Sequence, residues 1–418
     1  MSERGDCPKS VLPVRKAAPA FASASVHWRS KVRGTFGGSC TGPIIAMMIV
    51  CTATGSSAQN SPIPRTPWGD PDLQGIWTDE TTTPLQRAAK YASQEFFTDE
   101  QRAELDKARA ELLGRDKRVE RGTELDVAGA YNGQFVSVKR TGRRTSMIMD
   151  PPNGRVPPLT AVAQKIAAAD REFRLALLQS TDTCKSKSVA CTGGKYDPKP
   201  SPRRSELPPR YNTARMNRFD GPEDGALPDR CLTLGLPEFG ANAGSFRRIV
   251  QTPGGITMFY DVGQGQGWQR NILMDRPHLP PNIRQWFGDS RGHWEGNSLV
   301  IDVTNFSPKT DFMGARENLH LIERWTRTSA NTLEYVVTIE DPTVWVRPWT
   351  VVQEFTRQSD QDNRIYYEPR CIEGNYGLPG LMHGQRTQEN AFADGKGPDP
   401  ATRDIATDFV GVEDDPLQ

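Results

Sequence analysis

Three short stretches of this chain bring together residue types that exchange protons and bind anions. They are DRPHLPP at residues 275–281, GDSRGHWEG at 288–296 and ENLHLIERW at 317–325. Histidine exchanges protons near neutral pH, a carboxylate serves as general acid or base, and arginine holds an anionic or carbonyl group. Together with a tyrosine of CIEGNYG (371–377), these stretches form the predicted site. Its candidate catalytic residues are Glu323, His320 and His293, and its candidate substrate-binding residues are Arg276, His278, Asp289, Arg291, Trp294, Arg324 and Tyr376.

Glu323 is the candidate general acid or base. Side chains alternate between the two faces of a strand, so Glu323 shares one face with Leu321 and Trp325, and His320 lies on the other. If the apolar face is the interior, Glu323 is an inward carboxylate, and burial would suit it to acid–base chemistry. The alternative is a buried ion pair with an arginine such as Arg276 or Arg291. A direct contact between His320 and Glu323 is not expected from this strand alone.

The histidines have two interpretations each. His293 precedes a hairpin turn and is expected at the rim, either as a proton shuttle or as a solvent-facing side chain. His278 stands between Pro277 and Pro280, so it is either a rigidly placed catalytic residue or only part of a turn. Three histidines can bind zinc, but the helical HExxH spacing is absent and no metal is predicted.

Other motifs that would name a chemistry are absent from the sequence. The chain has no GxSxG nucleophile elbow, no Walker loop and no GxGxxG fingerprint, and GQGQG at 263–267 lacks the helix that a phosphate site requires. CIEGNYG could line a pocket through Glu373 and Tyr376, or could simply turn the chain after a strand. No redox cofactor is therefore implied.

The elements that must position these residues are strands. From residue 246 onward, apolar and polar residues alternate between turn signals, which predicts successive hairpins. The predicted pairs are FRRIVQTPGGITMFYD, GHWEGNSLVIDVTNF, LHLIERWTRTSANTLEYVVTIED, and WTVVQEFTR with RIYYEPRC. Earlier strands at 75–77 and 144–150 bring the total to nine or ten. This number can close a barrel or form two packed sheets, and the sequential order favours an up-and-down, lipocalin-like barrel.

The fold class is therefore mainly β, an antiparallel lipocalin-like barrel or sandwich with two helical insertions. Thr98 and Gln101 form a capping box before a charged helix at 99–114, and a second helix at 160–179 places Phe173 and Leu177 on its apolar side with Val162 and Ile166. The predicted segments are 1–58, a signal peptide; 59–90, with the first strand; 91–180, the helical insertion with one strand; 181–230, a loop; 231–386, the β meander; and 387–418, a polar tail.

The first segment predicts export. Basic residues at 29–33 precede the apolar run GPIIAMMIVCTATG and then small residues ending at Ala58, the order of a cleavable signal. The apolar run is too short to span a bilayer comfortably, so a permanent anchor is the less favoured alternative and no stable membrane span is expected after cleavage. The expected location is the periplasm or the medium, and the true start codon is left open.

Cysteine usage agrees with an oxidising compartment. Cleavage would leave Cys184, Cys191, Cys231 and Cys371, an even number that predicts two disulfides. Cys184 and Cys191 bracket CKSKSVAC, so a local bridge there is the natural pairing and leaves Cys231 for Cys371. Three pairings are possible in principle, and a metal site lacks the CxxC spacing. Charge is nearly balanced, which gives no indication of a nucleic-acid partner.

The joined motifs resemble those of a widespread family of exported, uncharacterised bacterial proteins. The residues that carry the resemblance are the RPH at 276–278, GDSRGHWEG and LHLIER, and the match covers nearly all of residues 65–386. The family brings no settled activity, so the resemblance implies export and architecture rather than mechanism. This chain departs from it at Ile372, where the family pattern has histidine, and in DVGQGQGWQ at 261–269, which replaces a strand bearing Glu and His.

Two functions fit these residues. The first is an exported small-molecule enzyme that uses metal-free acid–base chemistry, a hydrolase or lyase. In it Glu323 is the acid or base, His320 or His293 moves the proton, and Arg276 and Arg291 hold the substrate. The second is a non-catalytic, lipocalin-like binding protein for a small, partly apolar ligand. The oligomeric state and the ligand itself cannot be read from the sequence.

Overall fold

The structure is a computed structural model, and it describes residues 63–79, 81–114, 139–232, 235–239, 246–261, 267–359 and 377–404. The predicted signal peptide, its cleavage after Ala58, and the candidate residues Cys371 and Tyr376 lie outside these ranges. The predicted strand at 364–371 and most of GQGQG lie outside them too. In the described part, no helix is long and apolar enough to cross a membrane.

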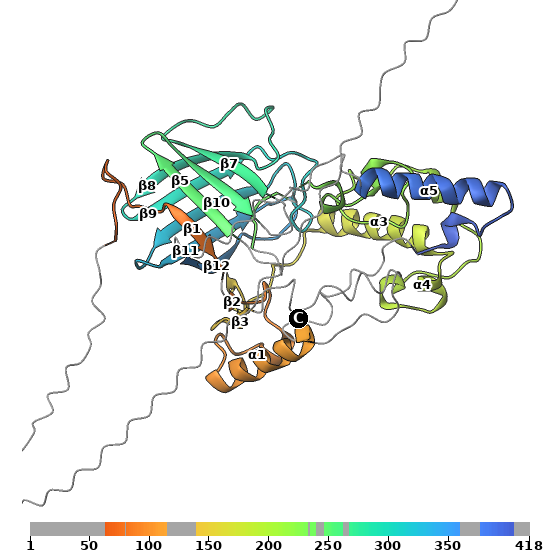
Figure 1. The fold of residues 1–418 in the computed structure, drawn as a ribbon, viewed down its shortest axis with the longest axis horizontal. Coiled ribbons are helices and arrows are strands. Elements are labelled where there is room, and N and C mark those ends of the chain that lie inside the picture. Colours follow the sequence, from red (N-terminus) through yellow and green to blue (C-terminus); the bar gives the residue numbers. More distant parts are fainter. Residues whose placement is uncertain are drawn as a thin grey trace, which may run out of the picture. The chain divides into compact units, whose positions relative to one another are not determined.

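Nine strands close into a barrel (Figure 1), as the hairpin pattern predicts. Their order is β1-β5-β6-β7-β8-β9-β10-β11-β12, and β12 pairs back to β1, so the alternative of two packed sheets is wrong. The strands are β1 Gly75–Thr78, β5 Phe246–Thr252, β6 Gly255–Asp261, β7 Gly267–Met274, β8 Asp289–Glu295, β9 Ser298–Thr304, β10 His320–Arg327, β11 Thr332–Glu340 and β12 Trp349–Arg357. A short strand, β4 Ile148–Asp150, adds to the start of β12.

At two places in the barrel wall, neighbouring strands pair over only two residues. Seven neighbouring pairs are antiparallel ladders of four to eight residue pairs, as a meander requires. β7 and β8, however, are parallel and share only Leu273–Arg291 and Met274–Gly292, because residues 275–288 cross between them without forming a hairpin. β1 and β12 also meet over two residue pairs. The closed sheet is therefore weakest at two places, between β7 and β8 and between β12 and β1.

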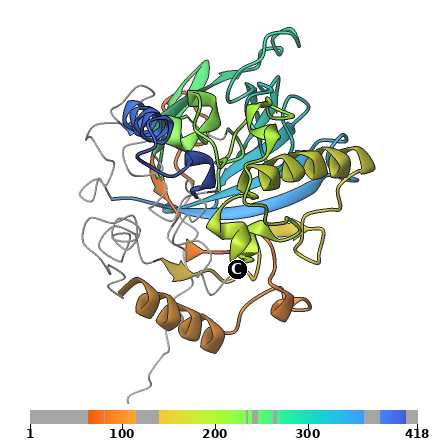
Figure 2. The same cartoon turned by 90° about the vertical axis from the view of Figure 1, so that its right-hand side faces the viewer.

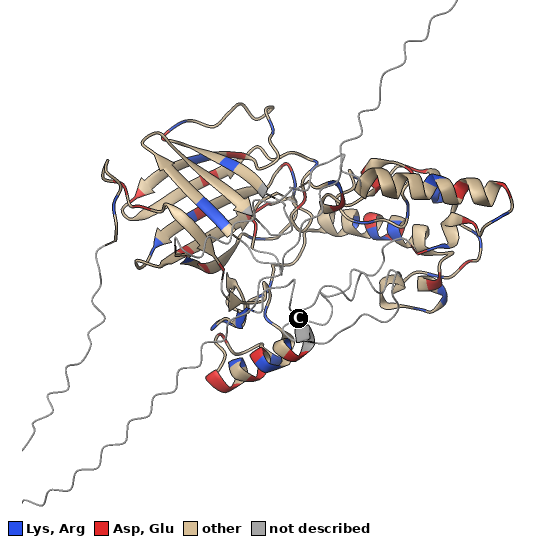
Figure 3. Ribbon diagram, in the orientation of Figure 1, with Lys and Arg blue, Asp and Glu red and all other residues tan. Residues whose placement is uncertain are grey.

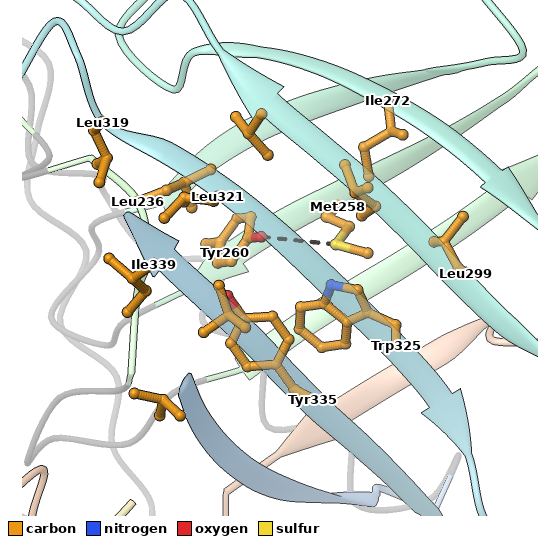
Figure 4. Close-up of a cluster of buried hydrophobic side chains, with 14 of the residues drawn as sticks. Leu236, Met258, Tyr260, Ile272, Leu299, Leu319, Leu321, Trp325, Tyr335 and Ile339 are labelled. Carbon is orange, nitrogen blue, oxygen red and sulfur yellow. Dashed lines mark hydrogen bonds between the residues drawn. The ribbon is translucent and has the colours of Figure 1, made fainter. Parts of the chain in front are cut away.

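Alternate residues of each strand point into the barrel interior. Along β10 the inward residues Leu321, Glu323 and Trp325 are buried, and the intervening residues face outward. Large aromatic side chains occupy much of this interior: Trp77, Trp325, Trp349, Tyr335 and Phe355 are each at most 2% exposed. Figure 4 shows Met258, Tyr260, Trp325 and Tyr335 facing one another inside the sheet. Burial of this apolar area is the main stabilising contribution to the fold.

Three long helices accompany the barrel (Figures 1 and 2): α1 Asp99–Gly114, α3 Ala161–Leu178 and α5 Gly377–Ala393. The capping box of α1 is confirmed, because Thr98 and Gln101 bond each other's backbone N–H. α3 is confirmed as well, and Phe173 and Leu177 are buried in it, but Val162 and Ile166 are 61% and 39% exposed. The N-terminal part of the predicted apolar face of α3 is therefore exposed to solvent. α5 was not predicted from the sequence.

The remaining elements are short. β2 Thr81–Thr82 pairs in parallel with β3 Arg140–Thr141. Residues 181–230 contain α4 Asp182–Lys185 and four 3-10 helices, and Met216 in this segment packs on Phe173 and Leu177 of α3. The 3-10 helices of the described chain are η1 Ala89–Tyr91, η2 Val189–Cys191, η3 Pro202–Ser205, η4 Pro222–Asp224, η5 Pro228–Arg230 and η6 Pro400–Thr402.

The local disulfide is confirmed: Cys184 and Cys191 are bonded, across a sequence separation of seven. Both sulfur-bearing side chains are buried against Leu178 at the end of α3. Cys231 also takes part in a disulfide, whereas its predicted partner lies outside the described residues. Acidic and basic residues are interspersed along the described elements (Figure 3), in line with the nearly balanced composition.

Candidate functional site

Glu323 lies inside the barrel as part of a buried polar group, here called the inner cluster: Arg270, Glu323, Tyr260, Tyr335 and Ser290. The Arg270 guanidinium of β7 and the Glu323 carboxylate of β10 form an ion pair with 2.7 Å between Nη1 and Oε2. The Tyr335 hydroxyl donates to Glu323 Oε1 at 2.9 Å. Arg270 also donates through Nε to Ser290 Oγ at 2.8 Å and through Nη1 to the Tyr260 hydroxyl at 3.3 Å.

This pairing fixes the charge states of the cluster. Burial alone would lower the pKa of Arg270, but the Glu323 carboxylate outweighs it and holds that pKa above its usual range. Burial raises the pKa of the Tyr335 hydroxyl well above 10, and the adjacent carboxylate of Glu323 raises it further. Burial likewise raises the pKa of Tyr260. Both tyrosines are therefore neutral hydrogen-bond donors or acceptors rather than bases.

Aromatic rings surround the inner cluster. The Trp325 ring lies 4.3 Å from Tyr335 and 5.7 Å from Phe355, measured between centroids. Two buried donors in this region, Arg270 Nη2 and Trp325 Nε1, have no hydrogen-bond acceptor among the described residues. Trp325 lies two residues beyond Glu323 on the same face of β10, so both donors belong to one region of the interior. A buried donor without an acceptor is costly, and it marks a place where a ligand atom could bind.

Two further buried ion pairs lie near this region. Arg247 of β5 is fully buried, contacts Glu238, and has its guanidinium 4.3 Å from the Phe355 ring centroid and 5.5 Å from that of Tyr260. Asp79, directly after β1, pairs with Lys139 at 2.8 Å, and burial raises the pKa of its carboxyl. Each of these buried cations in the described interior thus has a carboxylate beside it.

A second polar group runs across the outside of the barrel and is here called the outer row. Its members, in spatial order, are Glu340, His320, Asp302, His278, Asp289 and Arg291. His320 contacts Glu340 Oε1 through Nδ1 at 2.5 Å and Asp302 Oδ1 through Nε2 at 3.0 Å.

His278 repeats this arrangement, with Nδ1 2.8 Å from Asp289 Oδ2 and Nε2 3.3 Å from Asp302 Oδ1. Asp289 Oδ1 then accepts from Arg291 Nη2 at 2.8 Å. The outer row is therefore a continuous chain of alternating basic and acidic side chains.

Strand register explains the outer row. His320 lies opposite Glu340 in the β10–β11 ladder, and Asp302 lies opposite Arg291 in the β8–β9 ladder. His278 comes from the crossing segment after β7 and covers Asp289. The Asp302 and Glu340 carboxylates raise the pKa of His320 to about 9, and the hydrogen bond from His320 lowers the pKa of Asp302. His320 is consequently an imidazolium at neutral pH when nothing else is bound.

The other predicted residues lie apart from both groups. His293 is half exposed and contacts Glu295 at 3.1 Å, and Arg324 contacts the same carboxylate at 2.6 Å. Trp294 packs on the barrel core from the inner face of β8, and Arg276 is exposed. His293, Glu295 and Arg324 thus make a surface ion-pair group at the β8–β9 turn.

The structure does not bring Glu323 together with a histidine, as the acid–base hypothesis requires. Residues 320 and 323 of β10 point to opposite faces, so the barrel wall separates Glu323 from His320. His293 also points outward, on β8. The alternative of a buried ion pair between Glu323 and an arginine is confirmed, but the arginine is Arg270. Arg291 instead contacts Asp289 and the Pro277 carbonyl.

Sequence reasoning missed Arg270, Asp302 and Glu340. The sequence does indicate Asp302, because it is the single charged residue of the strand SLVIDVT. The sequence indicates Glu340 as well, because the hairpin turn places it opposite His320. No feature of the sequence indicates Arg270, because it reaches Glu323 across the interior from a strand that is not a neighbour of β10.

A cavity of about 710 Å³ lies beside α3. Its lining includes Arg174, Arg210, Met216 and Arg316. Arg174 donates to the Arg215 carbonyl at 2.6 Å and to Asn212 Oδ1 at 3.2 Å, and burial lowers its pKa. The volume is in the range of small-molecule sites, so this cavity is a second place where a ligand could bind.

Comparison with known proteins adds a likeness in fold. No family model matches the chain, and no curated protein matches it. Among solved structures, the barrel is similar to a secretary abundant heat soluble protein from Ramazzottius varieornatus, with 16% identity, a TM-score of 0.22, and coverage of 30% of this chain and 80% of that one.

Two further structures are similar. Fatty-acid-binding protein 1 of Echinococcus granulosus has 8% identity, a TM-score of 0.20, and coverage of 28% of this chain and 73% of that one. A mutant of the fluorescent protein UnaG has 16% identity, a TM-score of 0.19, and coverage of 29% and 78%. At these scores the likeness is confined to a short closed barrel and assigns no ligand.

Proposed function

We propose that this protein binds a small, partly apolar molecule inside its lipocalin-like barrel. The observation that supports the proposal most is that two buried donors beside the inner cluster, Arg270 Nη2 and Trp325 Nε1, have no acceptor among the described residues and lie among Trp, Tyr, Phe and Met side chains. A ligand oxygen that accepts from either donor would remove the cost of leaving it unpaired. Closed barrels of about this strand number hold one small ligand in other proteins.

The charges of the interior select the kind of ligand. Arg270, Arg247 and Lys139 each have a carboxylate partner, and Arg327 at the end of β10 donates to three backbone carbonyls, so an anion added beside the inner cluster would lack a free counter-charge. A neutral molecule with one acceptor, such as an aliphatic ketone or ester, meets the donors without that penalty. The enzyme hypothesis has less support, because Arg270 and Tyr335 hold Glu323 and no imidazole of the described chain contacts it.

Calorimetry with a medium-chain aliphatic ketone and the carboxylate of equal chain length tests this proposal. We expect one ketone per protein and weaker binding of the carboxylate. Trp325→Phe keeps the ring and removes the donor, so it should weaken ketone binding by about fivefold, the value of one hydrogen bond. Trp349→Phe is the matched control, because Trp349 Nε1 also lacks an acceptor among the described residues but lies beside Phe312 and Trp345.

Two results would contradict the proposal. One is the absence of saturable binding of either compound, together with no co-purifying molecule in native mass spectrometry. The other is binding that Arg174→Gln abolishes and Trp325→Phe leaves unchanged, which would place the ligand in the cavity beside α3.

We also propose that the protein is exported and acts in the periplasm or the medium. The order of basic, apolar and small residues in 29–58 supports a cleavable signal, and the disulfide supports an oxidising compartment. Membership in the exported family with RPH, GDSxGxWEG and LHxxER motifs is part of this proposal. N-terminal sequencing of the protein from a periplasmic fraction tests it, with a new N-terminus near Gln59 as the expected result.

A further inference from the structure

His278 and His320 are held in the same way, although they come from a loop and from β10. Each presents Nδ1 to a carboxylate, Asp289 at 2.8 Å and Glu340 at 2.5 Å. Each presents Nε2 to the same atom, Asp302 Oδ1, at 3.3 and 3.0 Å. Two imidazoles thus aim their second nitrogens at one point on the outer wall.

The carboxylate at each Nδ1 is what metal-binding histidines usually have at the nitrogen that does not bind the metal. A ligating imidazole usually donates its other N–H to a carboxylate, which fixes the ring and strengthens the free nitrogen as a ligand. The carboxylates here are themselves held. Asp289 is 2% exposed and accepts from the Leu279 N–H at 2.9 Å and from Arg291. Glu340 is fixed opposite His320 by the β10–β11 register. The two rings are therefore pre-oriented.

The formal charge of the outer row matches a divalent cation. Asp289, Asp302 and Glu340 contribute three negative charges, and Arg291 contributes one positive charge. A metal ion displaces the ring proton from each ligating imidazole, and two negative charges of the row are then uncompensated on a partly exposed surface. A divalent ion at the meeting point of the two Nε2 atoms would balance them.

As the side chains stand, no three donor atoms of the described residues enclose a metal position, because Asp302 Oδ1 occupies the point between the imidazoles. The Asp302 side chain is 44% exposed, so a rotation about its own torsions moves the carboxylate aside without disturbing the core. We propose that His278, His320 and Asp302 form a site for a divalent transition-metal ion on the outer wall of the barrel.

The donor set indicates the class of metal. Imidazole nitrogens favour zinc, copper, nickel, cobalt or iron over magnesium and calcium, which prefer oxygen ligands. Three protein ligands leave at least one coordination position to solvent, the condition for a site that also binds a water or a small anion. His293, which the sequence grouped with the other two histidines, is not part of this site.

Calorimetry of the EDTA-stripped protein with Zn²⁺, and the visible absorption of added Co²⁺, test the proposal. We expect one ion per chain, and His278→Gln or His320→Gln should weaken binding at least 100-fold. Glu340→Gln leaves the ligands in place and should weaken it by about 10- to 100-fold, the effect of losing a carboxylate behind a ligand. His293→Gln is the matched control, because His293 is another surface imidazole beside a carboxylate.

Failure of the unmodified chain to bind either ion with a Kd below about 10⁻⁴ M would overturn the proposal. So would binding that survives both His278→Gln and His320→Gln, or that His293→Gln abolishes equally. Circular dichroism of each variant checks folding, and Asp302→Asn, which keeps the shape of the site, should weaken binding as well. Ketone binding inside the barrel should be unaffected by His320→Gln, so this test is independent of the proposed function.

Discussion

Arg270 and Glu323 meet 2.7 Å apart across the barrel interior, and each side chain is 1% exposed. They come from β7 and β10, which are not neighbours in the sheet. An ion pair at this depth loses the hydration of both charges, so its members depend on each other more than a surface pair does. The pair therefore links the stability of the barrel to the chemistry of its interior.

Removing one member of this pair should be strongly destabilising. We expect Arg270→Met or Glu323→Gln alone to lower the free energy of unfolding by about 3–5 kcal/mol, since each leaves a buried charge unpaired. The double variant Arg270→Met with Glu323→Leu should recover most of the loss, because neither charge remains. Urea denaturation measures all three. A double variant destabilised by the sum of the two single losses would show that the two residues act separately.

Stability should fall as the pH rises through the range in which His320 loses its proton. Asp302 and Glu340 raise the pKa of His320 to about 9, above its ordinary 6.5. The folded state thus holds this proton more tightly than the unfolded chain does, so the contribution is complete below about pH 6.5 and is lost as the pH approaches 9. It amounts to at most about 3 kcal/mol, reduced by solvent screening. Denaturation of metal-free protein from pH 6 to 10 measures it.

His320→Gln is the control for this pH dependence. The amide does not titrate, so its unfolding free energy should lack the decline between pH 6.5 and 9. An unchanged decline in the variant would assign the effect to another group.

Gly292 should not tolerate a side chain. It faces inward where β8 meets β7, and a Cβ there would lie 2.7 Å from Met274 Sδ and 2.8 Å from Ile272 Cγ2. Gly292→Ala should therefore cost about 1–3 kcal/mol through overpacking. Gly254→Ala, in the β5–β6 turn with no atom within 4 Å of the added carbon, should change stability by less than about 0.5 kcal/mol. Thermal denaturation compares the two, and equal effects would rule out overpacking as the cause.

Replacing Cys184 and Cys191 by alanine should destabilise the end of α3. The bridge closes a loop with a sequence separation of seven, for which chain entropy gives about 2–3 kcal/mol. Both cysteines pack on Leu178, so amide exchange in the last turn of α3 should accelerate most. Exchange measured by mass spectrometry should leave the β10–β11 ladder nearly unchanged, and acceleration there would indicate a global role.

Much of the barrel could be predicted because its signals are local. Alternation along LHLIERW placed Glu323 inside and His320 outside, and the turns at 296–297 and 328–331 defined two hairpins. These features depend on residues a few positions apart. Pairing between neighbouring strands of a hairpin follows from the turn, which makes the contact of His320 with Glu340 derivable as well.

The partners of the site could not be predicted for a physical reason. Arg270 reaches Glu323 across the interior, and His278 reaches Asp302 from a crossing segment, so both contacts depend on how the barrel closes. α5 was missed because its sequence begins GLPG, with residues that disfavour helix interiors. Val162 and Ile166 were expected to pack with Phe173, yet the periodicity of a helix does not specify how much of it a neighbour covers.

Because the barrel wall has two short strand contacts, the inner cluster helps to hold the barrel closed. One part of the wall is β1 with β5 to β7, and the other is β8 to β12. Two residue pairs join these parts between β7 and β8, and two more join them between β1 and β12. Arg270 lies on β7 in the first part, whereas Ser290 and Glu323 lie on β8 and β10 in the second. These side chains therefore connect the two parts of the wall across the interior. A mutation that removes this ion pair, or a bound molecule that competes for the Arg270 guanidinium, should therefore also weaken the closure of the barrel.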